Sequence, residues 1–272
     1  MSRLAKSGTL KRGPLSQSDL VVSPTWEELE SQGKIKTIED KVAYALACPD
    51  LFFVWPLGYK YAEHQALWLK ISSKYQHVLL IAPNDHGKTE TMQVGYALWR
   101  LANDHDLRIG IISYTVEFAM ASVHMLKEKI EATPELALFG IKKSKTGQWS
   151  DKRATIERKL KSKDPSIAAI GFKGTIQNRR IDLGILDDVV DIRDYEAGTT
   201  IGDRIKTWFK RSLWTRFGDD GELKIIGTLQ AAGDLYNWIL TGETEDGIPM
   251  NELITCVRFK SLAKKHESLI VY

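Results

Sequence analysis

A short apolar run that leads into a polar, glycine-containing loop is the feature that most constrains how this chain can fold. The run is His-Val-Leu-Leu-Ile-Ala from His77 to Ala82, and the loop continues Pro-Asn-Asp-His-Gly-Lys-Thr to Thr89. A helical pattern follows, from about residue 89 to residue 102. A strand, a loop that ends in Gly-Lys-Thr and a helix, in this order, are typical of a phosphate-binding loop.

The residue types of this loop suit a phosphate group. Backbone amides of the loop and of the helix N-terminus would point at the phosphate, Lys88 can reach its outer oxygens, and the Thr89 hydroxyl can bind Mg²⁺. The pattern G-x-x-x-x-G-K-[ST] has glycine where this chain has Ala82, so an ordinary strand-to-helix turn with a surface lysine remains the alternative. The predicted nucleotide-binding loop residues are Pro83, Asn84, Asp85, His86, Gly87, Lys88 and Thr89.

A second buried strand, predicted over residues 183–186, ends in two adjacent carboxylates. We expect Asp187 to hold Mg²⁺ through its water shell, because Mg²⁺ takes oxygen ligands and gives up its waters reluctantly. We expect Asp188 to orient or deprotonate the attacking water, which makes it, with Lys88, a predicted catalytic residue. Asp188 is one methylene shorter than the glutamate most often second in such pairs, and the two carboxylates also suit a helix N-cap and turn.

Composition sets only broad limits. The chain has 272 residues, 43% of them hydrophobic, which suffices for one large α/β core or for a core with a small appendage. Its net charge of +3 neither demands nor excludes a polyanionic partner. Cys48 and Cys256 lie far apart without metal-ligand spacing, which favours a reduced intracellular protein. No apolar stretch has the length of a membrane span or the character of a signal peptide.

Changes in residue pattern and the positions of prolines along the chain predict its organisation. Residues 1–24 are polar and interrupted by Pro14 and Pro24, so we expect a flexible arm; residues 25–60 would form a helical lobe, residues 61–245 the main domain, and residues 246–272 a tail or linker. The predicted strands are 77–82, 108–113, 154–157, 167–171, 183–186 and 223–227, and the main-domain helices are 89–102, 116–132, 200–214 and 234–240. This alternation predicts a mainly parallel sheet flanked by helices, with ligands at the carboxyl ends of its strands.

Several segments, in order along the chain, carry a family resemblance. They are the run from Ala169 to Leu183, the Asp187–Asp188 pair, Trp208-Phe209, Leu213-Trp214-Thr215-Arg216 and Ile226-Gly227-Thr228. Together they resemble the ATPase domain of large terminase subunits, the DNA-packaging motors of tailed phages, over roughly residues 60–240. The resemblance implies a P-loop NTPase fold of the RecA- or helicase-like, ASCE type, with ATP and Mg²⁺ as ligands and ATP hydrolysis as the activity.

The resemblance also implies roles for single residues. Gln65 would read the adenine edge, a task that suits an amide, and Thr228 would couple the state of the γ-phosphate to movement of DNA-gripping parts. Arg179, slightly favoured over Arg180, would enter the active site of a neighbouring subunit, because a guanidinium neutralises charge on transferred phosphate oxygens. The alternatives are a solvated glutamine at Gln65, a plain strand-terminating turn at Thr228, and a surface arginine or a contact to DNA phosphate at Arg179 and Arg180. Many terminases have an arginine where this loop has Asn84, so we expect that charge to come from elsewhere.

The implied partners are double-stranded DNA, the portal protein and the small terminase subunit, in a homo-oligomeric ring on the portal, with a monomer when free, in the host cytoplasm and with no membrane contact. Residues 142–163 contain nine basic side chains against two acidic ones, Asp151 and Glu157, so this segment would contact DNA phosphates or form a solvated face. No run of carboxylates follows residue 240, so we expect no nuclease activity from this chain.

Two other classes of function remain open from the sequence. One is a helicase-like ATPase that remodels nucleic acid without packaging it. The other is a nucleotide-binding docking module that does not hydrolyse ATP, an alternative that Asp188 and Asn84 both favour.

Overall fold

The computed structural model describes residues 10–12, 15–21, 23–159, 161–172, 174, 180–195, 200–217, 221–244, 246–259 and 269–271. Within these residues the strands form a single sheet of nine, in the order β3-β4-β5-β2-β6-β7-β1-β8-β9. The strands from β5 to β8 in this order run parallel, and the pairs at the two edges are antiparallel. Their bounds are β1 His77–Ile81, β2 Ile109–Ser113, β3 Trp149–Ser150, β4 Arg153–Ala154, β5 Ile167–Gly171, β6 Leu183–Asp187, β7 Glu222–Gly227, β8 Thr255–Phe259 and β9 Leu269–Val271.

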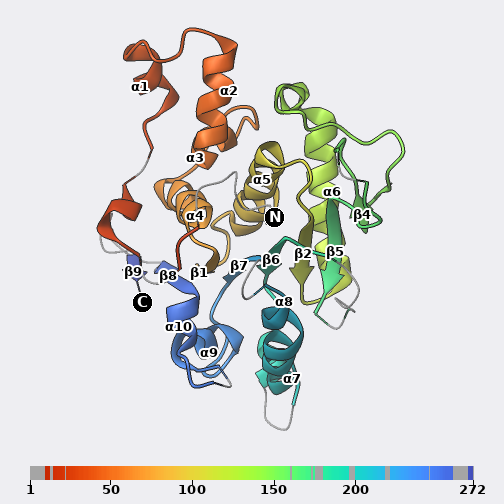
Figure 1. Cartoon of the computed structure of the whole chain (residues 1–272). Coiled ribbons are helices and arrows are strands. Elements are labelled where there is room, and N and C mark those ends of the chain that lie inside the picture. Colours follow the sequence, from red (N-terminus) through yellow and green to blue (C-terminus); the bar gives the residue numbers. More distant parts are fainter. Residues whose placement is uncertain are drawn as a thin grey trace.

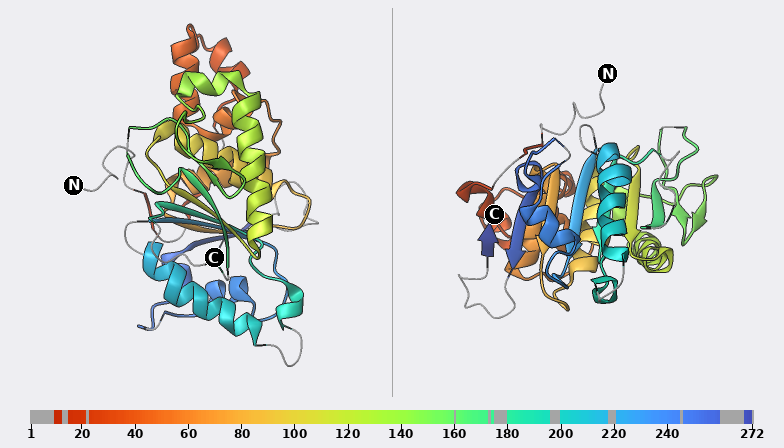
Figure 2. Two further views of the ribbon diagram at one scale, coloured as in Figure 1. Left: turned by 90° about the vertical axis from the view of Figure 1, so that its right-hand side faces the viewer. Right: turned by 90° about the horizontal axis from the view of Figure 1, so that it is seen from below.

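Helices cover both faces of this sheet, so the molecule has three layers (Figures 1 and 2). One face carries α1 Trp26–Ser31, α2 Ile38–Ala47, α3 Pro49–Val54, α4 Glu63–Lys74, the π-helix Glu90–Tyr96 with its continuation α5 Ala97–Asn103, and α6 Val116–Ala132. The other face carries α7 Ile201–Trp208, the π-helix Phe209–Trp214, α8 Thr215–Phe217, α9 Leu235–Thr241 and α10 Met250–Leu253. Short 3-10 helices span Gln17–Leu20, Pro134–Phe139 and Ile192–Tyr195.

The apolar sequence of the central strands follows from these two covered faces. Successive side chains of a strand point to opposite sides, so Val78 and Leu80 of β1 join the core under α1–α6, while Leu79 and Ile81 join the core under α7–α10. All five residues of β1 are buried. A parallel strand with helices on both sides has no solvent face, which explains why its sequence lacks polar alternation. The fold class predicted from the sequence, a mainly parallel sheet flanked by helices, is confirmed.

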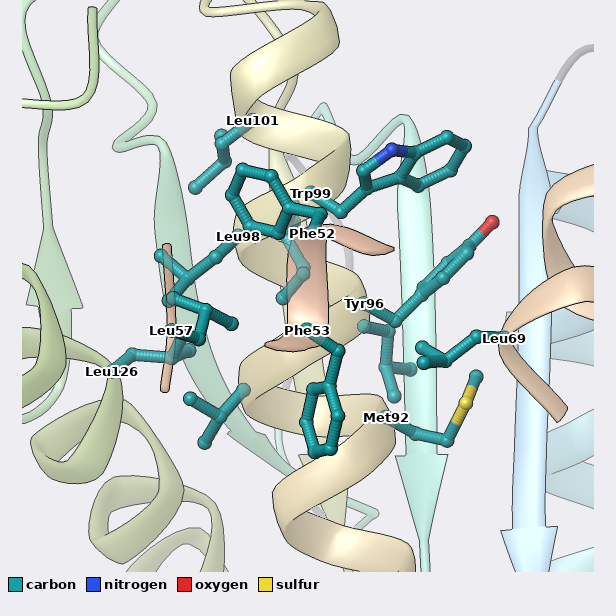
Figure 3. Packing of buried hydrophobic residues seen from close by; sticks show 14 of the residues in the cluster. Phe52, Phe53, Leu57, Leu69, Met92, Tyr96, Leu98, Trp99, Leu101 and Leu126 are labelled. Carbon is teal, nitrogen blue, oxygen red and sulfur yellow. The ribbon is translucent and has the colours of Figure 1, made fainter. Parts of the chain in front are cut away.

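The N-terminal helices share their core with the main domain. Figure 3 shows Phe52 and Phe53 of α3 in contact with the helix that follows the phosphate-loop segment, among Met92, Tyr96 and Leu98. At Gly95 of that helix, a Cβ atom would lie 2.4 Å from the Phe53 ring, so only glycine allows this approach. The predicted helical lobe therefore forms one packed layer with α4, α5 and α6.

Most predicted elements have the expected positions. The helix 116–132 and the strand 167–171 have the predicted bounds, whereas the predicted helix 89–102 divides into a π-helical and an α-helical part. The predicted strand 154–157 is shorter than expected: β4 ends at Ala154, and Ile156 forms only an isolated bridge with Lys143. This segment pairs with two different neighbours in turn, which a periodicity pattern does not reveal.

The described residues of the N-terminal arm, 10–12 and 15–21, contact the main domain at α4 and the residues that follow it. Asp19 is fully buried, and its carboxylate accepts hydrogen bonds from Ser16, Lys74 and Tyr75. These donors hold the pKa of Asp19 well below its usual range against the opposing effect of burial. The polar sequence of the arm does not indicate this contact. One buried carboxylate with several hydrogen-bond donors can attach a segment that has few apolar residues.

Part of the segment predicted as a C-terminal tail belongs to the sheet. Residues 250–253 form α10, and β8 pairs in parallel with β1, in the register Val78↔Thr255 to Ile81↔Arg258. The run Thr-Cys-Val-Arg-Phe is short and contains a charged residue, so its pattern was too weak to predict a strand. Within the described residues, the structure contains no helix whose length and hydropathy would let it cross a bilayer.

A small lobe at the sheet edge contains most of the basic segment. We define it as the edge lobe, residues 141–159, in which β3 and β4 form a hairpin and residues 142–144 pair with residues 155–157. α6 holds this lobe in place: Lys127 Nζ lies 2.6 Å and His124 Nδ1 lies 3.1 Å from Asp151 Oδ1, and Trp149 donates to Glu131 at 2.8 Å. Figure 1 shows the lobe beside α6.

The contact between His124 and Asp151 gives stability a defined pH dependence. Asp151, followed by Glu128, raises the pKa of His124, so the contribution of His124 is complete below its unfolded pKa of about 6.5 and is lost as pH rises through the higher folded pKa. His124→Gln should therefore melt below the wild-type protein at about pH 5.5 and together with it at about pH 9. Thermal unfolding at both pH values measures this, and an equal deficit at both would contradict it.

Candidate nucleotide site

The sheet register brings the predicted site residues to one edge. β7 lies between β1 and β6, and Ile81 pairs with Gly227 while Asp187 pairs with Ile226. The loop after β1, the carboxylates at the end of β6 and Thr228 after β7 therefore meet at the carboxyl ends of three adjacent strands, where open α/β sheets bind ligands. β7 thus separates the strand that precedes the loop from the strand that ends in the two carboxylates.

Two residues give the loop after β1 its shape. Asp85 and Gly87 have φ angles of 61° and 70°, in the left-handed region. A Cβ atom on Gly87 would lie 2.5 Å from Gln65 Nε2, so glycine is required there both for the backbone angle and for the close approach of α4. His86 Nδ1 lies 2.7 Å from the Asn84 carbonyl oxygen within the loop. His86 thus helps to shape the loop.

Lys88 lies buried at the centre of the site. Its ammonium donates to the carbonyl oxygens of Ala82 and Pro83 at 3.0 and 2.9 Å and to the Thr228 hydroxyl at 2.7 Å. Burial lowers the pKa of Lys88, and the carboxylates of Asp188, Asp187 and Asp85 oppose that shift. These three uncharged oxygen atoms bind the ammonium group for which the sequence predicts contacts with the phosphate oxygens of a nucleotide.

Thr89 and Asp187 form the second contact across the site. The Thr89 hydroxyl donates to Asp187 Oδ2 at 2.6 Å, while Asp187 Oδ1 is buried with no hydrogen-bond partner among the described residues. Burial, and next the neighbouring Asp188, raise the pKa of Asp187 to about 7. A hydroxyl oxygen beside a buried carboxylate with a free oxygen fits a hard divalent cation such as Mg²⁺, whose charge would offset the cost of burying that carboxylate.

Asp188 occupies an unusual backbone conformation beside Asp187. Its φ angle is 42°, which is uncommon for a residue other than glycine, and its amide donates to the Ile226 carbonyl oxygen at 3.2 Å. Its side chain is exposed, whereas Asp187 is buried. The two adjacent carboxylates therefore differ in environment: the first faces the protein and the second is open to solvent. Such asymmetry suits a division between cation binding and contact with water.

Thr228 connects the end of β7 to the loop. Its hydroxyl accepts the Lys88 bond and lies 2.9 Å from the Ala82 carbonyl oxygen and 3.0 Å from Asn84 Oδ1. One hydroxyl has a single proton, so it donates to only one of these two acceptors at a time. A change in the position of Lys88 or Asn84 would therefore alter the hydrogen bonds of Thr228 at the end of β7. The coupling role of Thr228 stays a prediction.

Gln65 also lies at the site, with its amide already engaged. Its Oε1 accepts the Ala62 backbone amide and its Nε2 donates to Thr91, both at 2.9 Å. These bonds fix Gln65 at the first turn of α4 against Gly87, and recognition of adenine by this residue remains a prediction. Sequence reasoning missed its aromatic neighbours: the ring of His64 lies 5.5 Å from that of His86 and 6.5 Å from that of Phe259. Phe259 belongs to the segment predicted as a tail, so no signal could have placed it here.

Of the two predicted arginines, Arg180 is not part of this cluster, and Arg179 lies outside the described residues. Arg180 precedes β6, and its amide lies 3.5 Å from Asp164 Oδ2. Arg180 lies before the amino end of β6 and Asp187 lies at its carboxyl end, and the strand alone is about 13 Å long, four steps of about 3.3 Å. The structure does not bring Arg180 to its own site, and a role in a neighbouring subunit remains a prediction.

The comparisons with known proteins give structural likeness only. No protein-family model and no curated protein sequence matches the chain. The fold resembles the large terminase ATPase domain of Thermus phage P74-26, with a TM-score of 0.44 and 18% identity, covering 73% of this chain and 78% of that one. It also resembles the large terminase of bacteriophage HK97, with a TM-score of 0.44 and 16% identity over 73% and 40% of the two chains.

The fold also resembles that of a helicase. The DEAD-box helicase Mss116, solved with single-stranded RNA and UDP-BeF, gives a TM-score of 0.38 and 13% identity over 83% and 43% of the two chains. Likeness at these identities and TM-scores transfers no function, so function has to follow from the site itself.

Proposed function

We propose that the chain is the ATP-hydrolysing motor domain of a phage large terminase, which couples Mg²⁺-dependent hydrolysis to movement of double-stranded DNA into a procapsid. One observation carries the hydrolytic part: Lys88 bonds to Thr228 while Thr89 bonds to Asp187, at the same edge of a parallel sheet. A buried cation, a hydroxyl, a buried carboxylate and an exposed carboxylate are thus together in the order that nucleotide hydrolysis requires.

Each residue would act on a defined atom. Lys88 would exchange its carbonyl and hydroxyl partners for outer phosphate oxygens of ATP, and the loop amides around Gly87 would hold the inner phosphates. Thr89 and Asp187 would hold Mg²⁺, which neutralises charge on the phosphate oxygens when it is bound. The exposed carboxylate of Asp188 would orient the attacking water and accept its proton.

A ring arrangement would supply a charge that the loop lacks. Asn84 cannot neutralise charge on the phosphate, and Arg180 lies before the amino end of β6, whereas Asp187 lies at its carboxyl end. In this proposal Arg179 or Arg180 of one subunit would reach the site of its neighbour. We therefore include in the proposal a homo-oligomeric ring, docked on the portal protein and supplied with DNA by the small terminase subunit.

A steady-state ATPase assay tests this function. The chain should release phosphate from ATP only with Mg²⁺, and double-stranded DNA should raise kcat. Stimulation by single-stranded but not double-stranded nucleic acid would favour a helicase-like enzyme. ATP binding without any turnover, in the presence of DNA and at subunit concentrations that allow assembly, would favour a docking module and would overturn the proposed hydrolysis.

A further inference from the structure

The edge lobe displays positive charge that the rest of the described chain does not neutralise. Of its two acidic residues, Asp151 is engaged by Lys127 and His124 of α6, and only Glu157 is exposed without such partners. Lys143 forms a 3.6 Å ion pair with Glu131. In and directly after the lobe, exposed lysines with no ion pair to any described residue are Lys142, Lys145, Lys152, Lys159, Lys161 and Lys163.

The lobe is fixed in position although it has little core of its own. Ile141, Ala154 and Ile156 are its buried apolar side chains, Trp149 packs partly against the same core, and β4 pairs with the first two residues of β5. Polar contacts also attach the lobe: Asp151 binds Lys127 and His124, and Glu131 accepts the Trp149 ring N–H at 2.8 Å. These contacts use the acidic groups to orient the lobe and leave the lysines at its surface. Such an arrangement complements a rigid polyanion.

The lobe and the nucleotide site lie at opposite ends of the sheet. Ala154 pairs with Ile167 at the amino end of β5, whereas the nucleotide site lies at the carboxyl ends of the strands. α6 connects the two ends: it begins three residues after Ser113, the neighbour of Asp187 in the sheet, and reaches the lobe at Lys127 and Glu131. These contacts are about 16 to 22 Å along the helix from its start, at about 1.5 Å per residue.

We propose that the edge lobe, with Lys161 and Lys163 beside it, is the surface of this domain that contacts the phosphate backbone of double-stranded DNA. This inference rests on the proposed function for its ligand and goes beyond it in naming the surface. Phosphate contacts of this kind carry no base recognition and make binding strongly dependent on salt. α6 then provides one continuous element between the DNA contact and the edge of the sheet where Asp187 lies.

The test is the salt dependence of DNA binding by the full chain. A fluorescent duplex of mixed sequence serves as the probe, and the association constant is measured by anisotropy at several salt concentrations. The lobe variant combines Lys142→Gln, Lys145→Gln and Lys152→Gln. Because each lost phosphate contact removes about 0.9 from the slope of log K against log [salt], the slope should fall by about 2 to 3 and affinity at about 0.1 M salt by 10-fold or more.

A matched control separates the surface from net charge. Lys34→Gln, Lys36→Gln and Lys60→Gln remove the same charge from exposed positions outside the edge lobe and should leave the slope unchanged. Equal losses in both triple variants, or no loss in the lobe variant, would overturn the assignment, as would absence of DNA binding by the wild-type chain. ATP turnover without DNA should be the same in all three proteins. This measurement tests the proposed hydrolysis independently of DNA binding.

Discussion

Replacing Lys88 with methionine should reduce ATP turnover by about 10²- to 10³-fold, the usual effect of removing one preorganised electrostatic contact from an active site. Lys88 is the only cation that the described residues place in contact with both Thr228 and the loop carbonyls. Asp187→Ala should have an effect of the same order, because it removes the buried carboxylate that Thr89 contacts. Phosphate release with saturating ATP and Mg²⁺ measures both variants.

Stability measurements distinguish loss of chemistry from loss of fold. Lys88 is a buried charge whose pKa is lowered by burial, so methionine, which retains much of its volume, should not lower the melting temperature. A variant that is folded and inactive supports the site assignment. Unchanged turnover in folded Lys88→Met and Asp187→Ala proteins would contradict it, whatever the DNA dependence.

The largest effect on stability should come from Glu222→Ala, at about 3–5 kcal/mol, the usual cost of removing one partner from a buried ion pair. Glu222 is bound by Arg100 and lies 3.5 Å from Lys224, whose side chain is fully buried. Lys224 also donates to the carbonyl oxygens of Tyr75 and Gln76. Alanine would leave two buried cations next to each other with no counter-charge. Urea unfolding near neutral pH measures the loss.

A triple variant tests whether charge burial is the cause. Arg100→Leu, Glu222→Leu and Lys224→Met together remove every charge of the network and keep most of its volume, so the triple variant should be more stable than Glu222→Ala. A triple variant that is less stable than Glu222→Ala would show that hydrogen bonds and shape, rather than unpaired charge, dominate at this position.

The parts of the structure that the sequence predicted are those with strong periodicity. The run from His77, the strand 167–171 and the helix 116–132 are each long or uniformly apolar, so a single pattern determines them. Strand ends then located the site, because a parallel sheet brings its carboxyl ends to one edge whatever the order of the strands. Lys88, Thr89 and Asp187 were predicted from such strand ends and Thr228 from the family resemblance, and the four residues lie together.

The parts that the sequence did not predict depend on contacts between distant segments. The burial of Asp19 requires donors from α4, and the assignment of Thr255–Phe259 to the sheet requires the open edge of β1. Neither partner is visible in the local sequence. The ring of Phe259 beside His64 follows from the second of these, so this side of the nucleotide site could not be inferred from motifs. The interruption of the helix 89–102 by a π-helical turn likewise has no local sequence signal.

The contact between Phe53 and Gly95 limits how the N-terminal segment can be separated from the rest of the chain. Phe53 occupies the space that any side chain at position 95 would need, only six residues after Thr89. Removal of residues 1–60 would therefore expose an apolar surface on the helix that follows the phosphate loop. A shortened protein of this kind would lose the α3 side chains against which that helix packs.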